Sequence, residues 1–181
     1  ALACDFCCYG CHPRRKEKMP LQLALRLVEE AASLGQFSSV GFTGGEATLF
    51  LDDLLAIGDR LITLKLPFTL ATAAQWGTSA SDARRTIDAL ADRGLCRLNI
   101  SHDPSHEKFV PRDHILNAVR AASARAATGG RARALVDIGA GAAAGPGVAP
   151  PAGRRLAGSA LLLLCPALAS AELAHAPQTE M

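Results

Sequence analysis

Segments expected to form strands alternate with segments expected to form helices over most of this chain. Strands are predicted at residues 38–43, 68–73, 95–101 and 134–138, and helices at 19–34, 52–64, 81–93 and 113–127. The repeat of roughly thirty residues is typical of βαβ units in a parallel sheet. Right-handed crossovers would curl such a sheet toward an open or closed barrel, with the functional loops at the carboxyl ends of the strands.

Particular residues are expected to begin and end these helices. Pro20 suits the first turn of the first helix, and Gly35 is a natural stop for it. Asp52 is expected to cap the second helix and Ser81 the third, since both types accept hydrogen bonds from free backbone N–H groups. Ile62 is expected in the core.

Length and charge limit the classes of protein that the chain can represent. A chain of 181 residues is long enough for one domain with a real core. The net charge is only +2, and no stripe of Lys and Arg with interleaved aromatic residues is present. This pattern carries no nucleic-acid signature.

The last part of the chain differs in composition from the rest. From residue 139 onward Ala, Gly and Pro dominate, so we expect a domain at 1–138 and an irregular or disordered low-complexity tail at 139–181. No further strand is predicted after residue 138. The apolar run at 156–173 is interrupted by Pro166 and carries Glu172, which disfavours a membrane span. The abrupt change also raises the hypothesis of a frameshift, which codon usage on either side of residue 139 would test.

Four cysteines crowd into residues 4–11, read as C-D-F-C-C-Y-G-C. Cys4, Cys8 and Cys11 have the spacing C-x3-C-x2-C, and such thiolates can converge on one inorganic cluster and leave one iron open. A structural zinc site is the alternative, with Cys7 or His12 as a fourth ligand. Clustered thiols without a secretory signal favour a reducing compartment, so we expect a cytoplasmic protein. The lack of an initiating Met suggests a start inside a longer chain.

Two more distinctive motifs follow predicted strands. Gly44, Gly45 and Glu46 come directly after residues 38–43, and S-H-D-P-S-H begins at the end of residues 95–101. Their position at the carboxyl ends of strands favours a functional interpretation. The alternative for the first motif is a plain turn. For Asp103 and His106 the alternative is helix capping or loop stabilisation.

Taken together, the three motifs resemble those of the radical S-adenosylmethionine (radical SAM) superfamily over about residues 1–130. The matching stretches are C-D-F-C-C-Y-G-C, G-F-T-G-G-E-A-T-L-F and N-I-S-H-D-P-S-H-E-K-F-V-P, in the order expected for that family. The resemblance implies an enzyme with a partial (β/α)6 TIM-barrel-like core. This core would be incomplete at both ends, because only residues 1–3 precede the cysteines and no sixth strand follows residue 138.

The resemblance also implies cofactors and the residues that hold them. Cys4, Cys8 and Cys11 would bind a [4Fe–4S] cluster, whose fourth iron is chelated by S-adenosyl-L-methionine. One electron from the cluster would cleave this cofactor reductively and start radical chemistry on the substrate.

Residues of the two later motifs would contact the S-adenosyl-L-methionine. Gly44, Gly45 and Glu46 would approach its methionyl amino group, mainly through backbone carbonyls that a Gly pair leaves accessible. Ser101 and Asp103 would lie near its ribose or carboxylate.

The resemblance leaves the substrate open. A peptide is one candidate, and His106 could face the substrate as an acid or base. An electron donor such as a flavodoxin or ferredoxin is the implied partner, and no membrane or nucleic-acid partner is expected. Two alternatives are a structural zinc- or iron–sulfur-binding module without catalysis and an inactive radical SAM fragment.

The chain departs from the family pattern in particular places. Gly10 stands directly before the third cysteine, where the family usually has an aromatic residue, and Tyr9 precedes it. The stretch L-A-T-A-A-Q-W-G lacks the Thr-Asn-Gly ending common at that strand. Trp76 and Cys96 are expected in the core rather than in a site.

Overall fold

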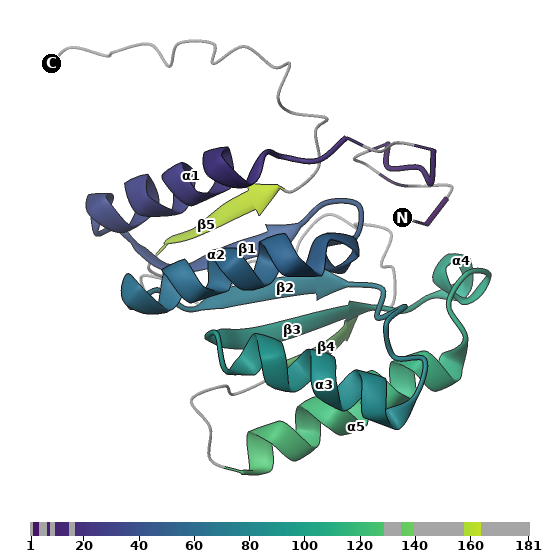
Figure 1. The fold of residues 1–181 in the computed structure, drawn as a ribbon. Helices are drawn as coiled ribbons and strands as arrows, with labels where there is room; N and C mark the ends of the chain where they lie inside the picture. The colour runs from purple at the N-terminus through teal and green to yellow at the C-terminus, as the bar shows by residue number, and fades with distance from the viewer. Residues whose placement is uncertain are drawn as a thin grey trace, which may run out of the picture.

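The computed structural model describes residues 2–3, 7, 10–14 and 17–128, together with the backbone of 135–139 and 158–163 (Figure 1). The fold is α/β, as the alternation of segments predicted. In chain order the elements are α1 (Leu21–Leu34), β1 (Phe37–Thr43), the short 3-10 helix η1 (Ala47–Phe50), α2 (Leu51–Thr63), β2 (Phe68–Thr72), α3 (Ala80–Ala91), β3 (Leu95–Ser101), α4 (Pro104–Glu107), α5 (Arg112–Ala127), β4 (Leu135–Gly139) and β5 (Gly158–Leu163).

The strands form one sheet in the order β4-β3-β2-β1-β5, and every neighbouring pair is parallel. Val40 of β1 lies opposite Phe68 of β2, and Leu70 of β2 lies opposite Leu98 of β3. Since all strands run the same way, their carboxyl ends meet at one edge of the sheet. The described part of the cysteine-containing loop lies beyond this edge (Figure 1).

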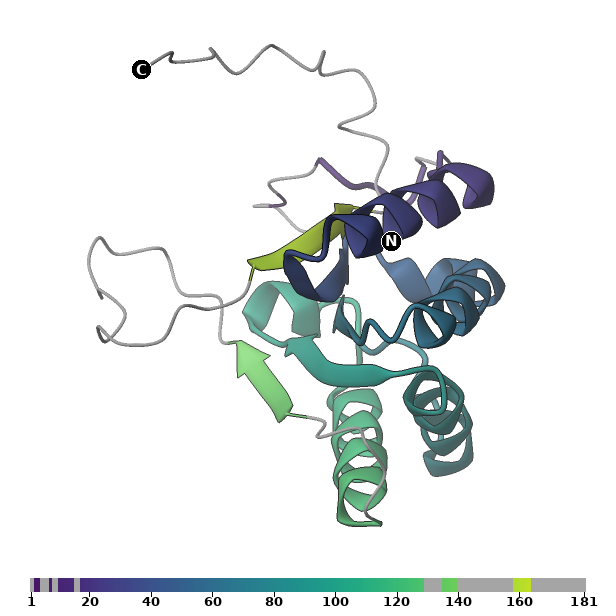
Figure 2. The ribbon, with the colours of Figure 1, turned by 90° about the vertical axis from the view of Figure 1, so that its left-hand side faces the viewer.

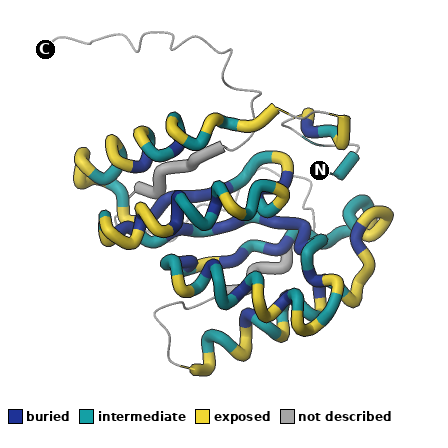
Figure 3. Tube along the Cα trace, in the orientation of Figure 1, coloured by how far each residue is buried: buried dark blue, intermediate teal, exposed yellow. Residues whose placement is uncertain are grey.

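Helices α1, α2, α3 and α5 cover one face of the curved sheet (Figure 2). The side chains that point toward them are apolar and buried, and Phe42 and Phe68 meet edge to face with their ring centroids 5.3 Å apart. Burying each such side chain contributes about 1.5–3 kcal/mol. Alternate residues on the same strands, such as Thr69, Asn99 and Ser101, are only half-buried (Figure 3). The sheet therefore has one sealed apolar face and one more polar face.

The predicted end of α1 is confirmed, but the helix begins at Leu21, with Pro20 before its first turn, and two predicted caps were wrong. Gly35 ends α1 with φ +63°, a backbone conformation that glycine adopts without strain. Ser79, not Ser81, caps α3, because its extended backbone lets its hydroxyl accept from the Asp82 N–H at 3.1 Å. Asp52 lies inside the first turn of α2, since η1 precedes that helix and supplies its start.

The core also differs from the prediction at one position. Ile62 is 47% exposed, whereas Ile57 of the same helix is buried. The two side chains are five residues apart, so they point away from each other on a helix with 3.6 residues per turn.

The tail contains a strand that the sequence did not reveal. Residues 158–163 form β5, which pairs with β1 from Phe37 to Thr43. The expectation that no strand follows residue 138 was therefore wrong at this point. A run of Leu and Ala has weak strand preference of its own, and here pairing with β1 decides the conformation. The domain division at residue 138 stays a prediction.

Among the described residues, none of the helices combines the length and apolar character needed to cross a membrane.

Ala74, in the loop that follows β2, is fully buried and has φ +55°, the left-handed conformation that costs an L-residue about 1–2 kcal/mol. Ala74→Gly relieves this cost but loses a buried methyl group and adds freedom to the unfolded chain. We expect the free energy of unfolding to change by less than about 1 kcal/mol.

The matched control is Ala83→Gly, a fully buried alanine inside α3. Ala83 has no such strain to relieve, so Ala83→Gly should lower the free energy of unfolding by about 1.5 kcal/mol. Urea unfolding measures the free energy of unfolding of both variants. Equal decreases in Ala74→Gly and Ala83→Gly would contradict the strain at Ala74.

Candidate active site

The carboxyl edge of the sheet brings together two of the three predicted motifs. Gly44 follows β1 directly, and Ser101 is the last residue of β3, with the end of β2 between them. Because neighbouring strands lie about 4.8 Å apart, β1 and β3 are separated by roughly 10 Å at this edge. The loops after β1, β2 and β3 therefore form one continuous surface.

Gly44 turns the chain away from β1 in a conformation that only glycine adopts readily. Its φ is +125°, far outside the regions open to residues with a Cβ. Gly45, the next residue, is exposed. The Gly pair thus forms a tight, open turn at the edge, where a ligand can approach the backbone closely.

Glu46 is 5% exposed, and its carboxylate accepts hydrogen bonds from two directions. On one side Thr48 donates its hydroxyl at 2.5 Å and its N–H at 3.3 Å to Oε1, which caps η1. On the other side the Thr72 hydroxyl donates to Oε1 at 2.8 Å, and the Ala73 N–H donates to Oε2 at 2.8 Å. The side chain therefore ties the end of β1 to the end of β2.

This geometry decides how Glu46 can serve the site. Its carboxylate points to β2 and the η1 turn, so it sets the path of the Gly44–Gly45 backbone through its own side-chain contacts. These bonds involve the carboxylate, and the predicted contact of the Glu46 backbone with a cofactor stays a prediction.

Asp103 and His106 form a compact local unit after β3. Asp103 caps α4, because Oδ1 accepts from the N–H groups of Ser105 at 2.8 Å and His106 at 3.1 Å. Its Oδ2 lies 2.6 Å from Nδ1 of His106. Burial raises the pKa of Asp103, but the hydrogen bonds from His106 and Ser105 and the His106 charge outweigh it, so the pKa is lowered from 3.8. The capping alternative is therefore realised, and contact with a cofactor stays a prediction.

His102 was not recognised from the sequence. It follows Ser101, and its Nε2 lies 3.2 Å from Oε1 of Glu107. Each of the two histidines in this loop, His102 and His106, therefore lies beside a carboxylate. No periodicity signals such pairs, because they depend on how the short helix α4 folds back.

Part of the cysteine loop lies within the described residues. Cys4 and Cys8 lie outside them, so the predicted trio stays a prediction. The N–H of Cys11, a buried residue, donates to Sγ of Cys7 at 3.3 Å. The Gly10 N–H donates to the Cys7 carbonyl at 3.0 Å, and Gly10 has φ +57°.

In the part of the chain that the structure describes, no three His, Cys, Asp or Glu side chains gather closely enough to hold a metal ion. Nδ1 of His12 accepts from the Arg14 N–H at 3.2 Å, so one ring nitrogen of this alternative zinc ligand is already engaged.

Comparison with protein families gives a match that covers most of the chain. The model of the radical SAM superfamily matches residues 1–130. The chain belongs to the radical SAM superfamily. Members of this superfamily are enzymes, which generally use a [4Fe–4S] cluster and S-adenosyl-L-methionine and generally need a reductant. No curated protein sequence matches the chain.

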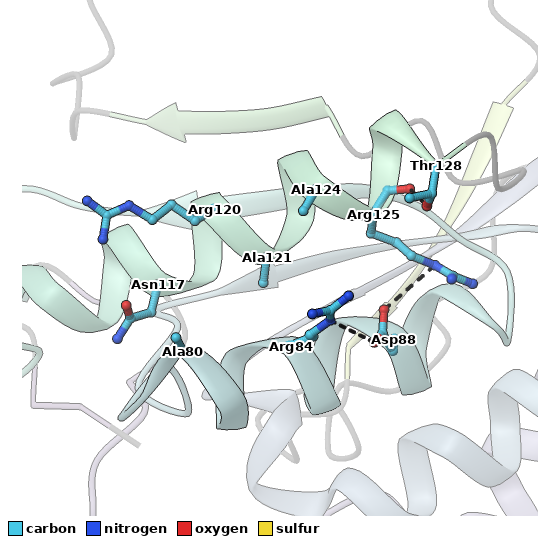
Figure 4. A pocket seen from close by; sticks show the side chains of 9 residues that line it. All are labelled: Ala80, Arg84, Asp88, Asn117, Arg120, Ala121, Ala124, Arg125 and Thr128. Atoms are coloured by element: carbon cyan, nitrogen blue, oxygen red, sulfur yellow. Dashed lines mark hydrogen bonds and ion pairs between the residues drawn. The ribbon is translucent and has the colours of Figure 1, made fainter.

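A groove of about 440 Å³ lies elsewhere on this radical SAM domain, between α3 and α5 (Figure 4). Arg125 of α5 reaches across it toward Asp88 of α3, and Arg84, one turn before Asp88 on α3, approaches the same carboxylate; each pair is 3.8 Å apart. The groove belongs to the outer helix layer, whereas the motif residues lie at the carboxyl edge of the sheet. It is therefore not the predicted site.

Glu46→Gln tests the tie between β1 and β2. An amide offers only one acceptor oxygen and sets an NH₂ group against a donor, so we expect a loss of about 2 kcal/mol in the free energy of unfolding. Glu30→Gln, on the exposed face of α1, is the control and should change it by less than about 0.5 kcal/mol. Urea unfolding measures both, and an equal effect would refute the tie.

Asp103→Asn tests the charge at the end of β3. Because the folded-state pKa lies below 3.8, the ionised carboxylate stabilises the fold above that pH, and the contribution is lost as pH falls through the folded-state pKa. Asn still caps a helix, so the variant isolates the charge and should lose about 1 kcal/mol near neutral pH. The gap in urea unfolding between the two proteins should close below about pH 4; a constant gap would contradict this assignment.

Proposed function

We propose that the chain is a radical SAM enzyme that uses a [4Fe–4S] cluster to cleave S-adenosyl-L-methionine reductively and so begins radical chemistry on a substrate. Cys4, Cys8 and Cys11 would hold the cluster. The observation that carries the proposal is the family match over residues 1–130, together with the Gly-Gly turn at the carboxyl edge.

The residues at this edge suit the cofactor. Gly44 and Gly45 offer backbone without side chains at an open turn, which fits a contact with the methionyl amino group. Three thiols are soft ligands of the kind that iron–sulfur clusters take. When bound, cluster and cofactor supply the one-electron chemistry; the chain binds, orients and shields them.

Finer parts of the proposal rest on family membership. We propose a partial (β/α)6 barrel, of which the parallel sheet β4-β3-β2-β1-β5 is the described part. A flavodoxin or ferredoxin would supply the electron, and the clustered thiols favour the reducing cytoplasm. A peptide is a candidate substrate. Ser101, Asp103 and His106 stay candidates for contacts with cofactor or substrate.

Anaerobic reconstitution with iron and sulfide tests the cluster. The full chain should gain a broad absorption band near roughly 400 nm, with about four irons per chain. Cys4→Ala, Cys8→Ala and Cys11→Ala should each abolish most of the band. Cys7→Ala and Cys96→Ala are matched controls and should keep it, because neither belongs to the C-x3-C-x2-C trio.

A structural zinc module is the main rival. Metal analysis would favour it if the purified chain held about one zinc and the reconstituted protein released no methionine from S-adenosyl-L-methionine under reductant. A chain that binds the cluster but never cleaves the cofactor would instead be an inactive radical SAM fragment.

A further inference from the structure

Trp76 is the single tryptophan of the chain, and it joins the hydrogen bonds at the carboxyl edge. It lies in the loop after β2 and packs against the hydrophobic core. Its Nε1–H donates to Oγ1 of Thr72 at 3.1 Å. Trp76 is therefore a partly buried residue at the border of the core, not inside it as predicted, and it also has a polar contact that the prediction missed.

The hydroxyl of Thr72 makes three hydrogen bonds, which fix the direction of its proton. Its oxygen accepts from Nε1 of Trp76 and from the Ala74 N–H at 2.9 Å, so both lone pairs are used. Its proton is then directed to Oε1 of Glu46 at 2.8 Å. The indole N–H thus helps to fix the direction in which Thr72 donates.

The loop that carries Trp76 is held on its other side by α5. Nδ1 of His114 lies 3.0 Å from the Gln75 carbonyl, and Nδ2 of Asn117 donates to the Gly77 carbonyl at 3.0 Å. A Cβ at Gly77 would lie 2.2 Å from the His114 carbonyl oxygen, so only glycine permits this approach. Trp76 is therefore presented from a backbone that is anchored on both sides.

We propose that Trp76 is a positioning residue for the Gly44–Gly45 turn, acting through Thr72 and Glu46. The indole holds the Thr72 hydroxyl, the hydroxyl holds the Glu46 carboxylate, and the carboxylate holds the turn. The consequence for cofactor affinity rests on the function proposed above, whereas the effect on the turn itself does not.

Amide hydrogen exchange of the full chain without cluster tests the effect on the turn. Trp76→Phe keeps most of the ring but loses the N–H, and it should speed exchange of the Thr48 and Ala73 amides by roughly three- to tenfold. Thr72→Val should act in the same direction more strongly. Thr72→Ser keeps a hydroxyl, so exchange of the Thr48 and Ala73 amides should stay as slow as in the unmodified protein.

The control is Phe68→Leu, a buried substitution at the opposite end of β2 that weakens packing without touching the hydrogen bonds. If Trp76 only packs, Trp76→Phe and Phe68→Leu will change these two amides alike at equal global stability. That result would overturn the proposal.

Equilibrium dialysis with S-adenosyl-L-methionine and the reconstituted protein tests the effect on the cofactor. Trp76→Phe should weaken binding by roughly three- to tenfold and Phe68→Leu should leave it unchanged. Faster exchange with unchanged affinity would refute the link to the cofactor. If the unmodified protein bound no S-adenosyl-L-methionine, the proposed function would fail, while the exchange rates would still decide the role of Trp76.

Discussion

The buried carboxylate of Glu46 is the interaction on which the carboxyl edge of the sheet depends. A carboxylate taken out of water costs several kcal/mol unless donors replace the lost hydration. Here the donors come from η1 on one side and from Thr72 and Ala73 on the other. The β2 donors are in reach only when β1 and β2 pair in the observed register, with Phe42 opposite Leu70. The register and the hydrogen bonds therefore stabilise each other.

The hydrogen bonds of this buried carboxylate distinguish the carboxyl edge of the sheet from the groove between α3 and α5. At the edge, the buried Glu46 carboxylate is matched by donors and the backbone turns at Gly44 with φ +125°. In the groove between α3 and α5, the pairs of Arg84 and Arg125 with Asp88 span 3.8 Å near solvent, where such pairs contribute about 0–1 kcal/mol. Among the described residues, the buried charge with the most directional contacts thus lies at the edge where two of the family motifs meet.

Much of the fold followed from the sequence because the relevant signals are local. The β3 bounds and the glycine stop of α1 depend on alternation and on one left-handed residue. The cap of α3 was misplaced because Ser79 and Ser81 are equally good acceptors, and only the backbone angles distinguish them. The bonds of Glu46 to β2 could not be predicted, since they join residues 26 and 27 positions apart. The pairing of β5 with β1 is more remote still, and nothing in an Ala- and Leu-rich stretch indicates its partner.

Two departures from the family pattern have a common physical explanation in backbone conformation. Gly10, where the family usually has an aromatic residue, has φ +57° and closes a turn onto Cys7. A residue with a Cβ would cost about 1–2 kcal/mol in that conformation, so the turn favours glycine over an aromatic residue at this position. Ala74 lies in the stretch that lacks the Thr-Asn-Gly ending, and it has φ +55°, a conformation that glycine adopts more readily. Its N–H donates to Thr72 and its carbonyl accepts from Gly77, so the surrounding bonds hold a conformation that alanine alone would avoid. The shape of this loop therefore comes from Thr72 and the loop's own hydrogen bonds, and it can persist when the residue best suited to it is absent.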